Sequence, residues 1–192
     1  MDRAPTAAAL LPARERILAT AHDLFYRHGV RATGIDRVIA EARVTKVTFY
    51  RHFPSKNDLV LAYLEARHEH WMQWFRAALE RHRAVSPGAA ALIPALGEWL
   101  RSPGYRGCGF LNSVSELAEE LPAVLEVTRR HKREMAAAVE TLLPAGAGRA
   151  RRTRALCIAL DGAIVHAQFG EPVDDVLRGL QLLMQGMLTE GE

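Results

Sequence analysis

Apolar residues recur at helical spacing along nearly the whole of this 192-residue chain, and no other feature limits the possible folds as strongly. Near the N-terminus, for example, Ile17, Ala21, Leu24 and Phe25 fall on one face of a helix. No segment sustains the alternation of apolar and polar residues, rich in β-branched types, that marks a half-buried strand. The sequence therefore predicts an all-α protein with about nine helices.

Start and stop signals set the predicted bounds of the first three helices. Gly29 closes the first helix. Thr33 and Asp36 have the spacing of a capping box that opens a short second helix. A third helix is predicted from Thr45 to Phe53, because Pro54 cannot continue it.

The rest of the chain is also predicted to be helical. Ser55 and Asp58 form another capping box, which opens a long fourth helix that runs to about His82. Breaks rich in Pro and Gly then separate five further helices, near 88–101, 108–120, 122–142, 150–169 and 172–188.

Positive charge is concentrated in the N-terminal quarter. Residues 12–56 hold nine Lys or Arg against four Asp or Glu, a net charge of +5, whereas residues 57–192 hold fifteen against seventeen, a net charge of −2. Such asymmetry indicates a bound polyanion, most often nucleic acid. Two basic runs in the second part, RRHKR (129–133) and RARRTR (149–154), are predicted to be solvated helix ends rather than extra nucleic-acid patches.

Composition favours a soluble, cytoplasmic protein. The chain is 49% apolar and 24% charged, and no apolar run approaches the roughly 18 residues of a membrane span. Cys108 and Cys157 lack metal-ligand spacing and are predicted to be reduced. His68 and His70 are two apart on a helix, cannot face one metal, and are predicted to be surface histidines. We therefore expect no membrane segment, no metal site and no cofactor.

The second and third helices, joined by a tight turn at 42–44, have the dimensions of a DNA-binding helix-turn-helix. On a helical wheel, Phe49 and Phe53 share one stripe and would anchor the third helix on the first two. The outward positions are then Lys46, Val47, Tyr50 and Arg51, with Thr48 and His52 on the flank. Cations on the outer face of such a helix meet DNA phosphates, so this helix is predicted to bind duplex DNA.

The segment TGIDRVIAEARVTKVTFYRHFPSKNDLV resembles the N-terminal domain of TetR-family transcriptional repressors, over about residues 12–60. The joint spacing of Tyr50, His52, Phe53 and Lys56 carries the resemblance. We therefore expect three parts: a disordered tail (1–11), a helix-turn-helix DNA-binding domain (12–55), and a ligand-binding and dimerisation domain (56–192).

The resemblance implies, position by position, which residues contact DNA. Tyr50, His52 and Lys56 would bind phosphates, and the backbone N–H groups of Thr33 and Gly34 would bind another. The first residues of the third helix would read base edges, since Lys46 can donate to guanine and Val47 can pack on a thymine methyl. The predicted DNA-binding residues are Thr33, Gly34, Arg43, Thr45, Lys46, Val47, Thr48, Tyr50, Arg51, His52 and Lys56.

The sequence departs from the family pattern at two positions. Arg43 stands where the pattern has Gly, so either a positive φ costs of order 1 kcal/mol there or the turn has a different shape. Val47 stands where a small residue or Pro is usual, which affects the expected base preference.

The last two predicted helices have features of a dimer interface. Alanines four residues apart in helix 150–169 let another helix approach closely, and helix 172–188 has a wide apolar face. Two such helices per chain can form a four-helix bundle about a two-fold axis, although both can also simply complete the monomer core. The predicted dimerisation residues are Ala155, Ala159, Ala163, Ala167, Val176, Leu180, Leu183 and Met187.

Aromatic and polar residues in the fourth helix and in the two helices after it predict a ligand site. The aromatic ones can line a cavity for an apolar ligand or can be plain core. Asn112 and Glu116, four residues apart, can be polar groups of the pocket or simply solvated. The predicted ligand-binding residues are Trp71, Phe75, Trp99, Phe110, Asn112 and Glu116.

Together these features predict a homodimeric transcriptional regulator, a repressor that a small-molecule effector releases from a palindromic double-stranded DNA operator. No motif supplies a convergent nucleophile and base, so no catalytic residue and no enzyme activity are expected. The alternatives are a regulator that senses oxidants or electrophiles through Cys108, and a helical scaffold protein that does not bind DNA.

Overall fold

The computed structural model describes residues 11–189, and within them the chain forms nine α-helices, a short 3₁₀ helix and no strand. The predicted all-α fold and helix number are therefore confirmed. The predicted tail at 1–11 lies outside the described residues except for its last position. The helices are α1 (Ala13–His28), α2 (Ile35–Glu41), α3 (Lys46–His52), α4 (Lys56–Arg83), η2 (Gly88–Ala91), α5 (Leu92–Leu100), α6 (Gly109–Leu117), α7 (Ala123–Glu140), α8 (Arg149–Gln168) and α9 (Val173–Thr189).

Most of the predicted helix ends are where the sequence placed them. Gly29 has φ 84° and its N–H donates to the carbonyl oxygen of Phe25 at 3.0 Å, so it ends α1 as expected. The Ser55 hydroxyl accepts the N–H of Asp58 at 3.2 Å and donates to its carboxylate at 2.7 Å, which confirms the capping box of α4.

The capping box predicted at Thr33 is wrong. Thr33 is completely buried, and its hydroxyl donates to the carbonyl oxygen of Gly29 at 2.8 Å. The N-cap of α2 is Gly34, with no side-chain capping bond. The Thr33 hydroxyl thus bonds back to the C-terminal end of α1 and does not cap α2, because a buried hydroxyl needs an acceptor and the Gly29 carbonyl supplies one.

The chain divides into two compact units, and two helices contribute to both. Within the described residues, the first unit comprises 11–68 and 109–128, and the second comprises 69–108 and 129–189. The first unit thus adds the beginning of α4, all of α6 and the beginning of α7 to the three N-terminal helices, whereas the sequence predicted a domain boundary at 55.

The first unit packs α1, α2 and α3 around a small apolar core. Ile17 and Ala21 of α1, Val38 of α2 and Phe49 of α3 are each 1% exposed or less. Tyr63 of α4 packs edge-on against Phe25, with ring centroids 5.5 Å apart.

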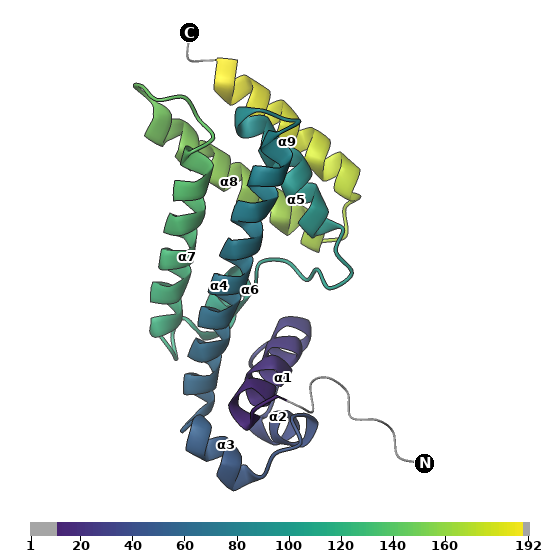
Figure 1. Cartoon of the computed structure of the whole chain (residues 1–192), viewed down its shortest axis with the longest axis vertical. Coiled ribbons are helices and arrows are strands. Elements are labelled where there is room, and N and C mark those ends of the chain that lie inside the picture. Colours follow the sequence, from purple (N-terminus) through teal and green to yellow (C-terminus); the bar gives the residue numbers. More distant parts are fainter. Residues whose placement is uncertain (1–10, 190–192) are drawn as a thin grey trace. The chain divides into compact units, whose positions relative to one another are not determined.

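In the second unit, the later part of α4 runs beside α7, and α8 packs along α9 (Figure 1). Arg76 of α4 pairs with Glu134 of α7 at 3.0 Å. Leu156 and Leu160 of α8 and Leu180 of α9 are buried in the core.

Two further findings concern predictions made from composition. His68 is buried rather than on the surface, because its side of α4 faces the core. In the part of the chain that the structure describes, no helix is both long and apolar enough to cross a membrane.

Candidate nucleic-acid interface

The turn between α2 and α3 contains one residue in the left-handed backbone conformation. Arg43 has φ 52°, so the turn has the positive φ that the family pattern with glycine implies, and not a different shape. Backbone bonds close the turn on both sides: the N–H of Ala42 donates to Val38 at 2.9 Å, and the N–H of Val44 donates to Ile39 at 3.2 Å. A non-glycine residue in this conformation costs about 1–2 kcal/mol, and the bonded turn holds it there.

Thr45 is the N-cap of α3. Its hydroxyl oxygen accepts the N–H of Thr48 at 3.1 Å, and its proton is donated to the Thr48 hydroxyl at 2.9 Å. This cap satisfies one of the free N–H groups at the start of α3. Thr45 therefore fixes the beginning of the helix that carries the predicted base-reading residues.

Two aromatic side chains hold α3 on the first unit. Phe49 and Phe53 are buried, with ring centroids 6.2 Å apart, as the helical wheel predicted. Arg14 of α1 lies over the Phe53 ring, 5.3 Å from its centroid. This anchoring fixes which face of α3 turns outward.

The outward face of α3 combines an apolar residue with cations. Val47 is 78% exposed and Tyr50 is 40% exposed. Lys46 lies 4.0 Å from Asp36, but both side chains are largely exposed, so this pair contributes about 0–1 kcal/mol and can open for another anion. Such a surface can lie in a major groove, with Val47 against the bases and the cations near phosphates.

The two predicted backbone donors before α2 differ in their availability. The N–H of Thr33 already donates to the carbonyl oxygen of Val30 at 3.2 Å. Gly34 is exposed, and a Cβ built there would have no neighbour within 4 Å. Gly34 is thus the open position at the N-terminus of α2, and the Thr33 N–H is not free for a phosphate.

Two carboxylates of the α6 region lie against the DNA-binding helices. Glu116 accepts the backbone N–H of Arg31 at 2.7 Å, and Glu120 accepts from the Arg31 guanidinium at 2.5 Å. A Cβ at Gly29 would lie 2.9 Å from a Glu116 carboxylate oxygen, so glycine permits this approach as well as the turn. The loop after α1 is therefore held by α6.

Lys56 begins α4 close to the same carboxylates. Burial lowers the pKa of the Lys56 ammonium, and the charges of Glu116 and Glu120 partly offset this effect. Sequence reasoning did not single out Arg31 or Glu120. The four-residue spacing of Glu116 and Glu120 indicates a carboxylate face, but nothing in the sequence says which cations it meets.

The predicted ligand residues are divided between the two units. In the second unit, Trp71 stacks on Phe75 at 4.7 Å between ring centroids and meets Trp99 at 5.5 Å and His131 at 4.9 Å. Among the residues that the structure describes, none accepts a hydrogen bond from the buried Nε1 atom of Trp71. Phe110, Asn112 and Glu116 belong to the first unit.

The predicted dimerisation residues differ in exposure. Ala163, Val176 and Leu180 are buried within the chain, and Leu183 is 56% exposed. Sequence reasoning missed three other exposed apolar residues in this region, Ile158, Phe169 and Leu182.

A short helix held on two others, with an exposed basic and apolar face, defines a helix-turn-helix DNA-binding protein. Comparison with known proteins agrees: the family model for bacterial regulatory proteins of the tetR family matches residues 17–63. SCO4454, a TetR-family transcriptional regulator from Streptomyces coelicolor, is 32% identical, covers 92% of this chain and 96% of its own, and superposes with a TM-score of 0.75. The chain belongs to the TetR family and is a DNA-binding transcriptional regulator.

Other relatives match over a smaller share of the chain. The HTH-type transcriptional activator FasR of Mycolicibacterium smegmatis is 30% identical over 95 residues, which is 48% of this chain and 43% of FasR. The uncharacterized HTH-type transcriptional regulator Rv1556 of Mycobacterium tuberculosis is 39% identical over 61 residues, 30% of its length. The chain thus matches less than half the length of either relative.

Proposed function

We propose that this protein is a homodimeric repressor that binds a palindromic operator in the cytoplasm and leaves it when a small molecule binds. The observation that carries the DNA part of the proposal is the outward face of α3, where Val47 and Tyr50 are exposed between Lys46 and Arg51. We also propose that the individual side chains predicted from the sequence to bind DNA make those contacts.

A dimer is supported by the surface of α8 and α9. Ile158, Leu182 and Leu183 are large apolar side chains that stay more than half exposed. Helix-turn-helix readers need two recognition helices about 34 Å apart to fill successive major grooves. A two-fold dimer through α8 and α9 would cover the apolar residues and supply the second recognition helix.

An effector site is supported by the aromatic cluster around Trp71. Within residues 11–189 the buried Trp71 indole N–H has no acceptor, which costs about 1–3 kcal/mol, so a ligand that accepts a hydrogen bond from it recovers that energy. An electrophile sensor is less well supported, because Cys108 is only 4% exposed and reactive thiols are normally accessible.

The sign of regulation is the second part of the proposal. FasR is by name an activator. Repression is expected if the selected operator, placed across a promoter, lowers reporter expression when the protein is present. Raised expression would assign an activator instead.

The decisive experiment selects bound sequences from random duplex DNA and then titrates salt. We expect a palindrome, and an affinity that falls steeply with salt because each phosphate contact releases counterions. Absence of binding at low salt would refute DNA binding, and a selected site without two-fold symmetry would refute the dimeric reader.

A further inference from the structure

Two basic runs that the sequence assigned to solvated helix ends meet at one groove in the second unit. From α7 come Arg129, Lys132 and Arg133, and from α8 comes Arg154. On each helix the lining positions are three or four residues apart, so each helix turns one face toward the groove. The fold thus gathers cations that lie about 20 positions apart along the chain.

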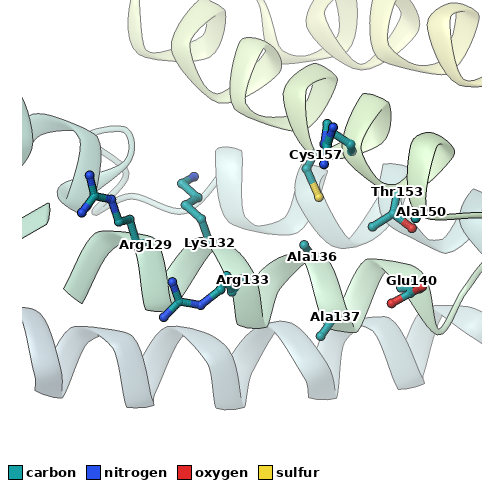
Figure 2. Close-up of a pocket in the computed structure, with 10 residues that line it drawn as sticks. Arg129, Lys132, Arg133, Ala136, Ala137, Glu140, Ala150, Thr153 and Cys157 are labelled. Carbon is teal, nitrogen blue, oxygen red and sulfur yellow. The ribbon is translucent and has the colours of Figure 1, made fainter. Parts of the chain in front are cut away.

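The groove is large enough for a small molecule and is not polar throughout. Its volume is about 560 Å³, within the range of roughly 300–1,000 Å³ that small-molecule sites occupy. Figure 2 shows the cations of α7 toward one end, Ala136 and Ala137 next along that helix, and Glu140 of α7 and Ala150 of α8 toward the other end. One end therefore suits a charged group and the middle suits an apolar one.

The charge of the lining is strongly positive. It contains four cations and a single carboxylate, that of Glu140. Glu140 already lies 3.9 Å from Arg149, and Lys132 donates to Asp161, which is outside the lining, at 2.5 Å. A bound anion would meet the guanidinium groups of Arg133 and Arg154, and a guanidinium group pairs with carboxylate or phosphate in a bidentate geometry.

The cysteine in the groove is neutral. Burial and the nearby charge of Asp161 raise the pKa of the Cys157 thiol to about 11. The thiol is protonated at neutral pH and adds to the apolar wall opposite Ala136 and Ala137, rather than adding a negative charge (Figure 2).

We propose that the groove between α7 and α8 binds a small organic anion, with its carboxylate or phosphate at Arg133 and Arg154 and its apolar body against the alanines. This site uses different residues from the proposed effector site at Trp71, and it does not depend on DNA binding. The alanine wall argues for an amphiphilic small molecule over duplex DNA, since DNA phosphates offer nothing apolar to cover it.

The test is calorimetric titration of the full chain, without DNA, with three probes below their micelle concentrations. Decanoate and decyl phosphate carry the two head groups, and 1-decanol has the same chain without charge. We expect at least one of the anions to bind ten times more tightly than decanol. Tighter binding of decyl phosphate would assign a phosphate ligand, and binding of decanoate that is equal or tighter would assign a carboxylate.

Paired variants locate the site. Arg133→Gln with Arg154→Gln should weaken anion binding at least tenfold, and Ala137→Leu should weaken it by filling the groove. Arg83→Gln removes one positive charge from an exposed arginine of the second unit, against two in the double variant, and should change binding less than twofold.

Three results would overturn the proposal. The first is equal binding of decanol and the anions, and the second is unchanged anion binding in the double arginine variant while circular dichroism shows both proteins folded. The third is no binding of any probe, and altered sedimentation of the double variant would then assign the groove to contact between copies of the chain.

Discussion

Arg43 adopts a backbone conformation that glycine adopts without strain. We predict that Arg43→Gly raises the free energy of unfolding by about 0.5–1 kcal/mol, because relief of about 1–2 kcal/mol of strain exceeds the extra chain entropy of glycine in the unfolded state. Urea denaturation at constant m-value measures this change.

Arg43→Ala is the matched control for that prediction. It removes the same side chain but retains a Cβ at φ 52°, so it should give no gain in stability. An equal gain for alanine and glycine would show that the arginine side chain, and not the backbone, causes the strain.

Lys46 and Lys56 carry the same charge, but Lys46 is predicted to contact a base and Lys56 a phosphate. Lys56→Ala should weaken binding to all duplexes about equally and lower the salt slope by roughly one, as expected for a lost phosphate contact. Lys46→Ala should instead change the preference at one base pair of each half-site by about 1–3 kcal/mol. Binding profiles over a library of duplexes distinguish the two, and a changed preference for Lys56→Ala would move it from phosphate to base contact.

At the scale of elements, α6 brings negative charge to a region that the proposed function places near phosphate. Glu116 and Glu120 contact Arg31 and lower the field that Lys56 presents. We predict that Glu116→Gln with Glu120→Gln strengthens operator binding at low salt by about threefold, since exposed charge pairs contribute about 0.2–1 kcal/mol. Fluorescence anisotropy with labelled operator measures this.

Glu119→Gln provides the control, because it removes one carboxylate from the same segment, at an exposed position. It should change operator affinity by less than the double variant does. Weaker DNA binding by the double variant would mean that the carboxylates mainly hold the loop after α1 in place.

Local signals predicted the helices well because helix ends depend on neighbouring residues. Gly29, Pro54 and Ser55 act within a few positions of themselves, and the structure confirms the helix ends they predicted. Thr33 has an equally good local signal, but its hydroxyl bonds back to Gly29. The burial of Thr33 favours the Gly29 carbonyl over the N-terminus of α2 as its partner, and the spacing of residues in the sequence does not show which side chains are buried.

Contacts between distant segments were beyond local reasoning. The Arg31 pairs with Glu116 and Glu120 join positions 85 and 89 residues apart. The groove between α7 and α8 likewise depends on how two helices pack, and not on the charge of either run. Long-range contacts of this kind need the fold itself, whereas the face of α3 followed from the positions of Phe49 and Phe53 alone.

At the scale of the whole molecule, DNA recognition is expected to depend on dimerisation. Leu182→Glu with Leu183→Glu places two carboxylates on an exposed apolar part of α9, which a folded monomer tolerates and a buried interface does not. We predict a monomer by sedimentation and an operator affinity about 100-fold lower, because the two half-sites are no longer bound together.

Val85→Glu is the control for this change, since Val85 is 87% exposed outside α8 and α9. It should leave both sedimentation and operator affinity unchanged. A dimer that survives the double change on α9 would move the interface elsewhere.

The proposed communication between effector and operator involves both units of the chain. Helix α4 contributes Lys56 to the first unit and Trp71 and Phe75 to the second, so a ligand that shifts α4 at Trp71 is expected to affect DNA contacts at Lys56. For a hundredfold loss of DNA affinity, the ligand must bind the DNA-free form about 2.7 kcal/mol more tightly.

We predict that Trp71→Ala leaves the operator affinity of the ligand-free dimer within about threefold and blunts the response to inducer. Trp71→Phe keeps a ring against Phe75 but removes the indole N–H, so it should retain folding and lose part of the response. Operator affinity with and without inducer is measured for all three proteins. A normal response in Trp71→Phe would remove the hydrogen bond from the mechanism, and loss of folding or dimerisation in Trp71→Ala would make Trp71 an ordinary core residue.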